Sequence, residues 1–137
     1  MTMIPITPEE AQDFVDWTRV KIKIHASVYK RFPHKREIWW ISLGKNVGVE
    51  MNGKHENFER PALVIRQYNN DASLILPVTS QQKEGNWFYD FVGASGESNS
   101  VNLSQLRTVS HKRFLRRVGK MDSSAFLEIK EKLKNFV

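Results

Sequence analysis

The sequence predicts a mainly β protein, namely a small and strongly curved β-barrel with a C-terminal helix and an added N-terminal helix. Three observations support this class. Short apolar segments follow one another at close intervals, they do not alternate with helices as in a βαβ protein, and one helical apolar stripe stands near the end of the chain. With 137 residues, of which 40% are hydrophobic, the chain is long enough for one folded domain.

The first helix is expected to begin at Thr7 and to run to about Ala26. Thr7 is a good N-cap, Pro8 suits the first helical position, and Glu10 completes a capping box. A period of two over residues 20–24 leaves a strand there as an alternative. Apolar side chains fall on two opposite faces of this helix: Ala11, Phe14, Val15, Thr18 and Ile22 on one, and Trp17, Val20 and Ile24 on the other. We expect one face to pack on the barrel or on the C-terminal helix, and the other to contact a second subunit or a protein partner.

The strands and the closing helix follow from local patterns. A polar loop from Gly44 to Glu59 comes after the first strand, and its sixteen residues exceed the usual length of a structureless connection. We therefore expect this loop to be functional, to be the most mobile part of the barrel and to cover the edge that carries Arg60 and Thr79. Asp122 should cap the last helix, whose core stripe is Phe126, Ile129, Leu133 and Phe136. The strands are expected at residues 37–43, 62–65, 74–78, 86–92, 100–103 and 114–120.

Two polar residues stand at the ends of neighbouring strands. Arg60 precedes the apolar run of residues 62–65, and Thr79 follows the run of residues 74–78. The turn-forming sequence Asn69-Asn70-Asp71 lies between the runs, so they should form an antiparallel hairpin. Chain reversal then brings Arg60 and Thr79 to the same edge of the sheet. We expect the functional site at this edge.

Composition excludes several classes of protein. The chain has no cysteine, which removes disulfides, thiolate catalysis and cysteine zinc sites, and which fits a reducing cytoplasm. No apolar run approaches the roughly 18 residues of a membrane helix, and residues 1–8 lack the pattern of a signal peptide. Histidines and carboxylates show no metal-ligand spacing, and the glycines form no phosphate loop. We expect a cytoplasmic protein with no metal, no cofactor and no membrane partner.

The net charge of +6 is concentrated in two clusters. Residues 17–36 contain seven bases and no acid, and residues 107–120 contain six more bases. Such clusters favour polyanions, with nucleic acid first and an acidic protein next, and a merely solvated basic face is the plain alternative. In this organisation residues 1–35 form a helical extension with a basic linker, and residues 36–137 form the barrel with its C-terminal helix.

Several short segments occur together in one order. They are Arg36-Glu37-Ile38-Trp39-Trp40, Gly48-x-Glu50, Arg60-Pro61-Ala62-Leu63-Val64-Ile65, Pro77-Val78-Thr79-Ser80-Gln81, Leu103-Ser104-Gln105-Leu106-Arg107-Thr108-Val109 and Arg117-Val118-Gly119-Lys120. This order resembles the MazF/PemK family of type II toxin-antitoxin toxins over about residues 36–136. The resemblance implies a Src-homology-3-like barrel, usually a homodimer. It also implies metal-independent, sequence-selective cleavage of single-stranded RNA (mRNA), restrained by a cognate antitoxin.

The chain departs from the compact members of this family in three places. Residues 52–58 lengthen the loop before Arg60 by several residues, and the N-terminal extension of about 35 residues is additional. Some relatives use an Arg and an Asp just before the Gln-x-Arg-Thr element. Residues 97–101, which match that stretch, contain no Arg.

The resemblance also implies roles for individual residues. Metal-free RNA cleavage uses the 2′-hydroxyl as nucleophile and needs a base, an acid and donors for the phosphoryl oxygens. Arg60 can give two hydrogen bonds to a phosphate and stabilise its charge, proton donation being a further role, and Thr79 can hold a phosphoryl oxygen. Glu50 is the implied base, with His55 as its rival because an imidazole titrates near neutrality. The expected substrate-binding residues are Lys54, His55, Ser80, Gln81, Gln105 and Arg107, the last two as supports of the loop edge.

Two other functions remain open at this level. The same barrel serves non-catalytic inhibitors of DNA gyrase, and a nucleic-acid-binding module without nuclease activity would carry the same basic clusters. Adjacent aromatics at residues 87–89 could stack on bases, although such residues in a strand more often belong to the core. We expect His25, His34 and His111 at the surface.

Overall fold

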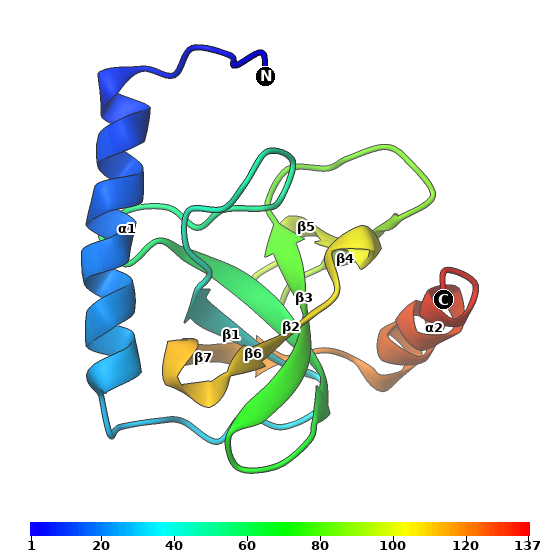
Figure 1. The fold of residues 1–137 in the computed structure, drawn as a ribbon. Coiled ribbons are helices and arrows are strands. Elements are labelled where there is room, and N and C mark those ends of the chain that lie inside the picture. Colours follow the sequence, from blue (N-terminus) through cyan, green and yellow to red (C-terminus); the bar gives the residue numbers. More distant parts are fainter.

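The computed structural model describes residues 1–137, and antiparallel strands make up its centre (Figure 1). The strands are β1 (Glu37–Ser42), β2 (Glu59–Gln67), β3 (Ala72–Thr79), β4 (Phe88–Val92), β5 (Ser98–Asn102), β6 (Arg107–Ser110) and β7 (Phe114–Lys120). The helices are α1 (Pro8–Ala26) and α2 (Ser123–Lys134), with 3₁₀ turns at Leu103–Gln105 and His111–Arg113. Neither α-helix has the length and apolar character that crossing a membrane requires.

The sheet has the strand order β4-β5-β3-β2-β1-β7, and every paired neighbour is antiparallel. Strand β3 changes partner along its free edge, because Ala72–Ile75 pair with β6 and Val78–Thr79 pair with β5. Register shifts in the β1–β7 and β2–β3 pairs mark irregularities that bend the strands. The result is a small, curved, barrel-like sheet flanked by two helices, which confirms the predicted fold class.

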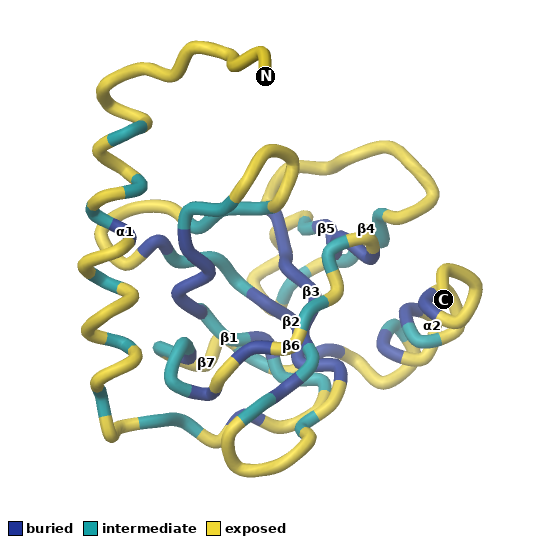
Figure 2. Tube along the Cα trace, viewed as in Figure 1, coloured by how far each residue is buried: buried dark blue, intermediate teal, exposed yellow.

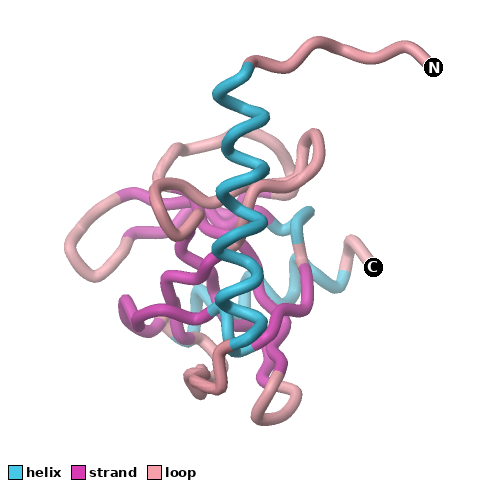
Figure 3. Tube along the Cα trace, turned by 60° about the vertical axis from the view of Figure 1, so that its left-hand side comes forward, coloured by secondary structure: helices cyan, strands magenta, loops and turns pink.

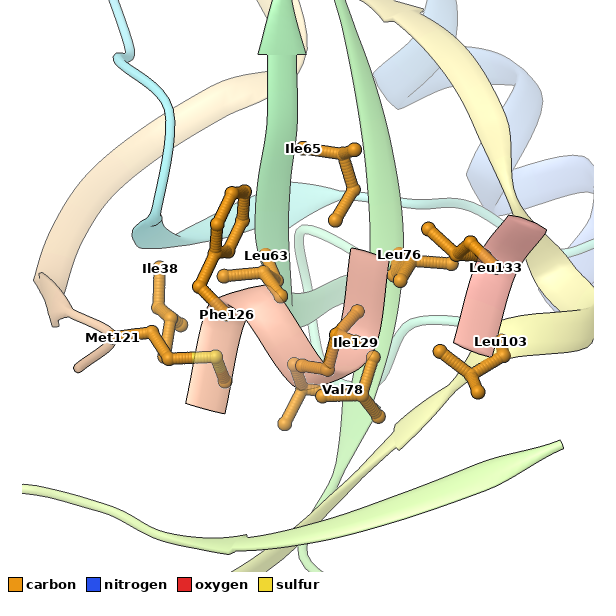
Figure 4. Close-up of a cluster of buried hydrophobic side chains, with 11 residues drawn as sticks. Ile38, Leu63, Ile65, Leu76, Val78, Leu103, Met121, Phe126, Ile129 and Leu133 are labelled. Atoms are coloured by element: carbon orange, nitrogen blue, oxygen red, sulfur yellow. The ribbon is translucent and has the colours of Figure 1, made fainter. Parts of the chain in front are cut away.

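Strand β2 is buried on both faces, which explains its continuous apolar run. Successive side chains of a strand point to opposite faces. Leu63 and Ile65 therefore join a cluster of 11 buried residues that also includes side chains of α2, while Ala62 and Val64 join a second cluster of 7. Figure 4 shows the first cluster, in which side chains of α2 lie against Leu63, Leu76 and Val78.

Helix α2 begins as predicted, but it ends before the last residue of the predicted apolar stripe. Asp122 is the N-cap, and its carboxylate accepts hydrogen bonds from the backbone N–H groups of Ser124 and Ala125. The buried residues of the helix are Phe126, Ile129 and Leu133, as the stripe predicts. The prediction of Phe136 as a core residue is wrong, because the helix stops at Lys134 and this ring is 47% exposed.

Helix α1 lies along one side of the sheet, away from α2 (Figures 1 and 3). The Thr7 hydroxyl accepts a hydrogen bond from the backbone N–H of Glu10, and the helix runs to Ala26, so the alternative of a strand at residues 20–24 is wrong. Its single buried residue is Trp17, and the rest of the helix is mostly exposed (Figure 2). On the face with Phe14, Val15 and Ile22, the last two are exposed and Phe14 is half-buried beside Lys45. The contact of this face with a second subunit or a protein partner stays a prediction.

The sequence patterns do not predict strand β6, which places His111 in the core. The prediction of a surface His111 is wrong, because the residue is 0% exposed. Its Nδ1 is 2.8 Å from the carbonyl oxygen of Asn70 and its Nε2 is 2.8 Å from the hydroxyl of Ser73. A carbonyl oxygen can only accept, so Nδ1 carries the proton and Nε2 accepts from Ser73. The imidazole thus joins β3 to the turn before it.

Acid should weaken the fold through His111. Burial lowers the pKa of this imidazole below its ordinary value of 6.5. The unfolded chain therefore binds a proton that the folded chain does not, and the free energy of unfolding should fall as the pH drops below about 6.5. Urea unfolding at pH 7.5 and pH 5 measures this, with His111→Gln expected to show a smaller difference between the two. An equal loss of stability in both proteins would contradict the prediction.

Candidate active site

The β2–β3 hairpin brings Arg60 and Thr79 to one edge of the sheet. Ala62 pairs with Pro77, and continuing this register by two residues sets Arg60 opposite Thr79. The Arg60 Nη1 donates to the carbonyl oxygen of Val78 at 3.3 Å. Thr79, which also pairs with Ser100 of β5, is only 8% exposed. The guanidinium and the hydroxyl therefore lie together, as the hairpin predicts.

Arg60 carries a partly buried charge that no carboxylate neutralises. Its Nε donates to the carbonyl oxygen of Asn52 at 2.6 Å, and its other bond within the protein is the one to Val78. The ion pairs of the protein leave Arg60 out, since the adjacent Glu59 pairs with Arg116. Burial lowers the pKa of the Arg60 guanidinium from its ordinary value. Three of its N–H groups remain available to an anion, the fork geometry that suits a phosphate.

A cleft of about 700 Å³ opens over this edge. Arg60, Thr79 and Ser80 line it from the hairpin, and Lys54 and His55 line it from the loop before β2. The Thr79 oxygen accepts a hydrogen bond from the backbone N–H of Gln81 at 3.2 Å, and its own hydroxyl proton has no acceptor within the protein. The hydroxyl can therefore donate to a ligand oxygen beside the guanidinium. Other walls come from β4, β5, β7 and the start of α2, including Tyr89, Asp90, Asn99, Lys120 and Asp122.

The β1–β2 loop (residues 43–58) flanks the cleft, as its length and polarity predict. His55 and Phe58 have φ angles of 66° and 48°, a region that bulky residues rarely adopt and that recurs at functional sites. Gly53 lies so close to Phe58 that an added Cβ would stand 1.7 Å from the Phe58 carbonyl oxygen. Lys54 and Glu59 exchange backbone hydrogen bonds of 2.8 and 2.9 Å. The loop is thus folded back onto the start of β2, next to Arg60.

Only one of the two candidate bases lines the cleft over the Arg60/Thr79 edge. His55 lines the cleft with Arg60 and Thr79, whereas Glu50 does not. The Glu50 carboxylate accepts a hydrogen bond from the backbone N–H of Val47 at 2.9 Å. It lines a second cavity of about 870 Å³, which Arg60 and His55 also border.

The expected substrate-binding residues divide into two groups. Lys54, His55 and Ser80 line the cleft, and Gln81 is exposed just beyond it. Gln105 instead holds the loop, because its Oε1 accepts from the Met51 backbone N–H at 2.9 Å and its Nε2 donates to the Val49 carbonyl oxygen at 3.2 Å. Arg107 borders a third cavity with Gln105 and Glu50, apart from Arg60 and Thr79. Gln105 therefore has the supporting role that the sequence predicts.

Sequence reasoning missed parts of the cleft. Asp90 and Asn99 come from the β4–β5 hairpin, and Lys120 comes from the end of β7. Their place depends on how β5 pairs with β3 and β7 with β1, and no local pattern carries that information. The aromatic cluster is partly open, with Trp87 exposed and Tyr89 half-buried against the cleft. No three histidine, aspartate or glutamate side chains are grouped to hold a metal ion.

Comparison with solved structures shows MazF-like folds. The chain is similar to MazF from Deinococcus radiodurans, with a TM-score of 0.66, 22% identity, and coverage of 77% of this chain and 96% of that one. It is similar to a MazE–MazF complex from the same organism (TM-score 0.60, 20% identity, 77% and 95% covered). A mycobacterial endoribonuclease in complex with its cognate antitoxin gives a TM-score of 0.56 at 10% identity, with 75% and 92% covered. At these identities the likeness shows the fold.

Comparison of the sequence itself gives a family. A search of curated protein sequences found no significant match. The family model of the PemK-like, MazF-like toxins of type II toxin-antitoxin systems matches residues 34–137, which include the whole sheet, the Arg60/Thr79 edge and α2. Since this match covers well over half of the sequence, the chain belongs to the PemK-like, MazF-like toxin family.

Proposed function

We propose that this toxin is an endoribonuclease that cleaves single-stranded RNA at the Arg60/Thr79 cleft. The observation that carries the proposal is the Arg60 guanidinium, which is partly buried, has no carboxylate partner and lines the same cleft as Thr79, whose hydroxyl proton has no acceptor within the protein. Such a charge favours an anion of phosphate geometry. Members of this toxin family are generally endoribonucleases, which supports an RNA phosphodiester as that anion.

The chemistry needs only the RNA, the side chains of the cleft and water. The 2′-oxygen attacks the adjacent phosphorus, a bond forms between them, and the bond from phosphorus to the 5′-oxygen breaks. The proton of the 2′-hydroxyl passes to a base, and the departing 5′-oxygen takes a proton from an acid or from water. Arg60 and Thr79 donate hydrogen bonds to the phosphoryl oxygens as negative charge grows there. The products are a 2′,3′-cyclic phosphate and a 5′-hydroxyl end.

His55 is the base in this proposal. Of the two candidates, only His55 lines the cleft with both Arg60 and Thr79. Loss of a general base typically lowers a rate about 10²–10⁴-fold. His55→Asn should therefore reduce single-turnover RNA cleavage by roughly 10²-fold, and Glu50→Gln should reduce it far less. Both side chains are exposed, so both variants should fold. The opposite order of the two effects would return the role of base to Glu50.

The test of the function is incubation of the purified protein with a long single-stranded RNA in EDTA, next to Arg60→Ala. Discrete fragments from the wild type alone are expected, because the proposed step uses no metal ion. A wild type that leaves RNA intact but blocks DNA gyrase would favour the gyrase-inhibitor reading. RNA binding without cleavage would favour a binding module.

We further propose that a cognate antitoxin restrains this protein and that the active form is a homodimer in the cytoplasm. The antitoxin complexes among the similar structures support a partner of this kind. Co-purification with the product of the adjacent gene, followed by mass measurement in solution, tests both parts. A monomer that does not bind that product would contradict them.

A further inference from the structure

Helix α1 contacts the β1–β2 loop through its buried Trp17 and also through Phe14, whose ring centroid lies 5.4 Å from Lys45 Nζ. Trp17 is the only buried residue of the helix and is 7% exposed. Its ring centroid lies 5.7 Å from that of Phe58, and the Arg113 guanidinium lies 5.7 Å from the indole on another side. Gly44 leaves room for the indole, because a Cβ there would stand 2.5 Å from Trp17 Cε2. The indole thus occupies a fitted site between the two ends of the loop.

Phe58 is the point on which the ends of this loop converge. Its carbonyl oxygen accepts hydrogen bonds from the backbone N–H groups of Leu43 at 2.8 Å and Gly44 at 3.1 Å. Its own φ of 48° is unfavourable for a bulky residue, so contacts outside its backbone must stabilise it. The Trp17 indole is the aromatic partner of Phe58 in the protein. Helix α1 therefore helps to hold a strained residue of the loop in place.

A short series of contacts leads from Phe58 to Arg60. Gly53 donates its backbone N–H to the Gly44 carbonyl oxygen at 2.8 Å and packs against Phe58. Asn52, the preceding residue, accepts the Arg60 Nε hydrogen bond at 2.6 Å. Movement of Phe58 would displace residues 52–54, and with them the acceptor that fixes the direction of the Arg60 guanidinium. The links before Arg60 are backbone contacts or packed rings, and the last link is the side-chain hydrogen bond from Arg60 to Asn52.

We propose that Trp17 is a positioning residue for the cleft, and that α1 is an added brace which holds the β1–β2 loop in its active arrangement. The indole fixes Phe58, Phe58 fixes the turn at Gly53, and that turn fixes Arg60 through Asn52. The inference rests on the proposed RNA cleavage. It assigns to the N-terminal helix a part in the rate of that reaction.

The protein offers a matched control at the other end of α1. Lys112 Nζ donates to the His25 carbonyl oxygen at 2.8 Å, which ties the last turn of the helix to the barrel. This bond touches neither the loop nor the cleft. Lys112→Met removes a tie between helix and barrel, as Trp17→Ala does, and leaves the Phe58 contact intact. Trp17→Phe keeps an aromatic ring at the contact itself.

The experiment measures kcat and KM for single-stranded RNA with the full chain, with these three variants, and with Phe58→Leu alone and in combination with Trp17→Ala. A misplacement of about 1 Å can cost roughly 10²-fold in rate. Trp17→Ala should therefore lower kcat by about 10–10²-fold with little change in KM, since charge in the cleft is unaltered. Trp17→Phe should recover most of the loss, and Lys112→Met should match the wild type. Phe58→Leu combined with Trp17→Ala should cost no more than the larger single effect, because both act on one contact.

The outcomes separate the two proposals. A wild type that does not cleave RNA overturns the proposed function, whatever the variants do. Cleavage by the wild type with an unchanged kcat in folded Trp17→Ala overturns the role of Trp17 alone. Equal losses in Trp17→Ala and Lys112→Met would also overturn it, since they would reflect helix docking in general. If Trp17→Ala does not fold, Trp17→Leu replaces it, and a kcat equal to that of Trp17→Phe contradicts the proposal.

Discussion

Replacing Arg60 with alanine is expected to lower RNA cleavage by about 10²–10³-fold or more, the usual effect of losing one donor to transition-state charge. The barrel should remain folded, because the guanidinium lies at the edge of the sheet and its hydrogen bonds go to the carbonyl oxygens of Asn52 and Val78. Single-turnover cleavage of saturating RNA measures the effect. The loss should appear mainly in kcat, since the donor acts on charge that grows during the reaction.

Arg66→Ala is the matched control, because Arg66 is an exposed arginine of the same strand at its far end. It removes the same charge from the protein and should leave the cleavage rate close to that of the wild type. Arg60→Lys is informative as well, since it keeps the charge and loses the planar fork. It should recover only part of the activity. Full activity in a folded Arg60→Ala protein would contradict the role of Arg60 in stabilising the transition state.

Replacing Gly53 with alanine should lower the rate of cleavage, although Gly53 itself takes no part in the reaction. The new Cβ would meet the Phe58 carbonyl oxygen at 1.7 Å and its carbon at 2.0 Å, so the backbone of the loop must move. The paired hydrogen bonds between Lys54 and Glu59 would break, and the Asn52 oxygen would leave Arg60. We expect kcat to fall by about 10²-fold, the scale of a 1 Å misplacement. The free energy of unfolding should fall by about 1–3 kcal/mol, as for other local overpacking.

Gly48 provides the comparison within the same loop. A Cβ at Gly48 would meet nothing within 4 Å, although its φ of 56° makes alanine unfavourable there by about 1 kcal/mol. Gly48→Ala should therefore lower stability by an amount similar to that of Gly53→Ala, and it should leave the cleavage rate nearly unchanged. Thermal unfolding and cleavage rates of the two variants settle the point. Equal activity in both would mean that the Gly53–Phe58 contact does not position Arg60.

The sequence predicted the features that local patterns encode. The helix start at Thr7 and the cap at Asp122 follow from residues within a few positions of one another, and the hairpin that joins Arg60 to Thr79 follows from the turn at residues 69–71 between its two strands. Each has a mechanism in capping, turn chemistry or strand alternation. The Arg60/Thr79 edge could therefore be predicted from the sequence, because an antiparallel hairpin determines which of its residues are neighbours.

What the sequence missed depends on contacts between distant segments. His111 is buried because β6 pairs with β3, and a short strand of four residues with one buried side chain gives little signal. Trp17 lies 41 positions before Phe58. The positive φ of Phe58, which helps to form the site that Trp17 occupies, cannot be predicted from the composition of the loop. Phe136 follows the helical period yet lies beyond the end of the helix. Periodicity alone cannot show where a helix stops.

End-group analysis of the RNA fragments shows whether the 2′-oxygen of the RNA is the nucleophile. A long single-stranded RNA is cleaved by the wild type in EDTA, the cleavage position is mapped, and the RNA is remade with a single 2′-deoxynucleotide immediately before the cut. We expect 2′,3′-cyclic phosphate and 5′-hydroxyl ends, and no cleavage at that position of the substituted RNA, because the attacking oxygen is gone. Fragments with 5′-phosphate ends, or equal cleavage of the two RNAs, would contradict the proposed mechanism.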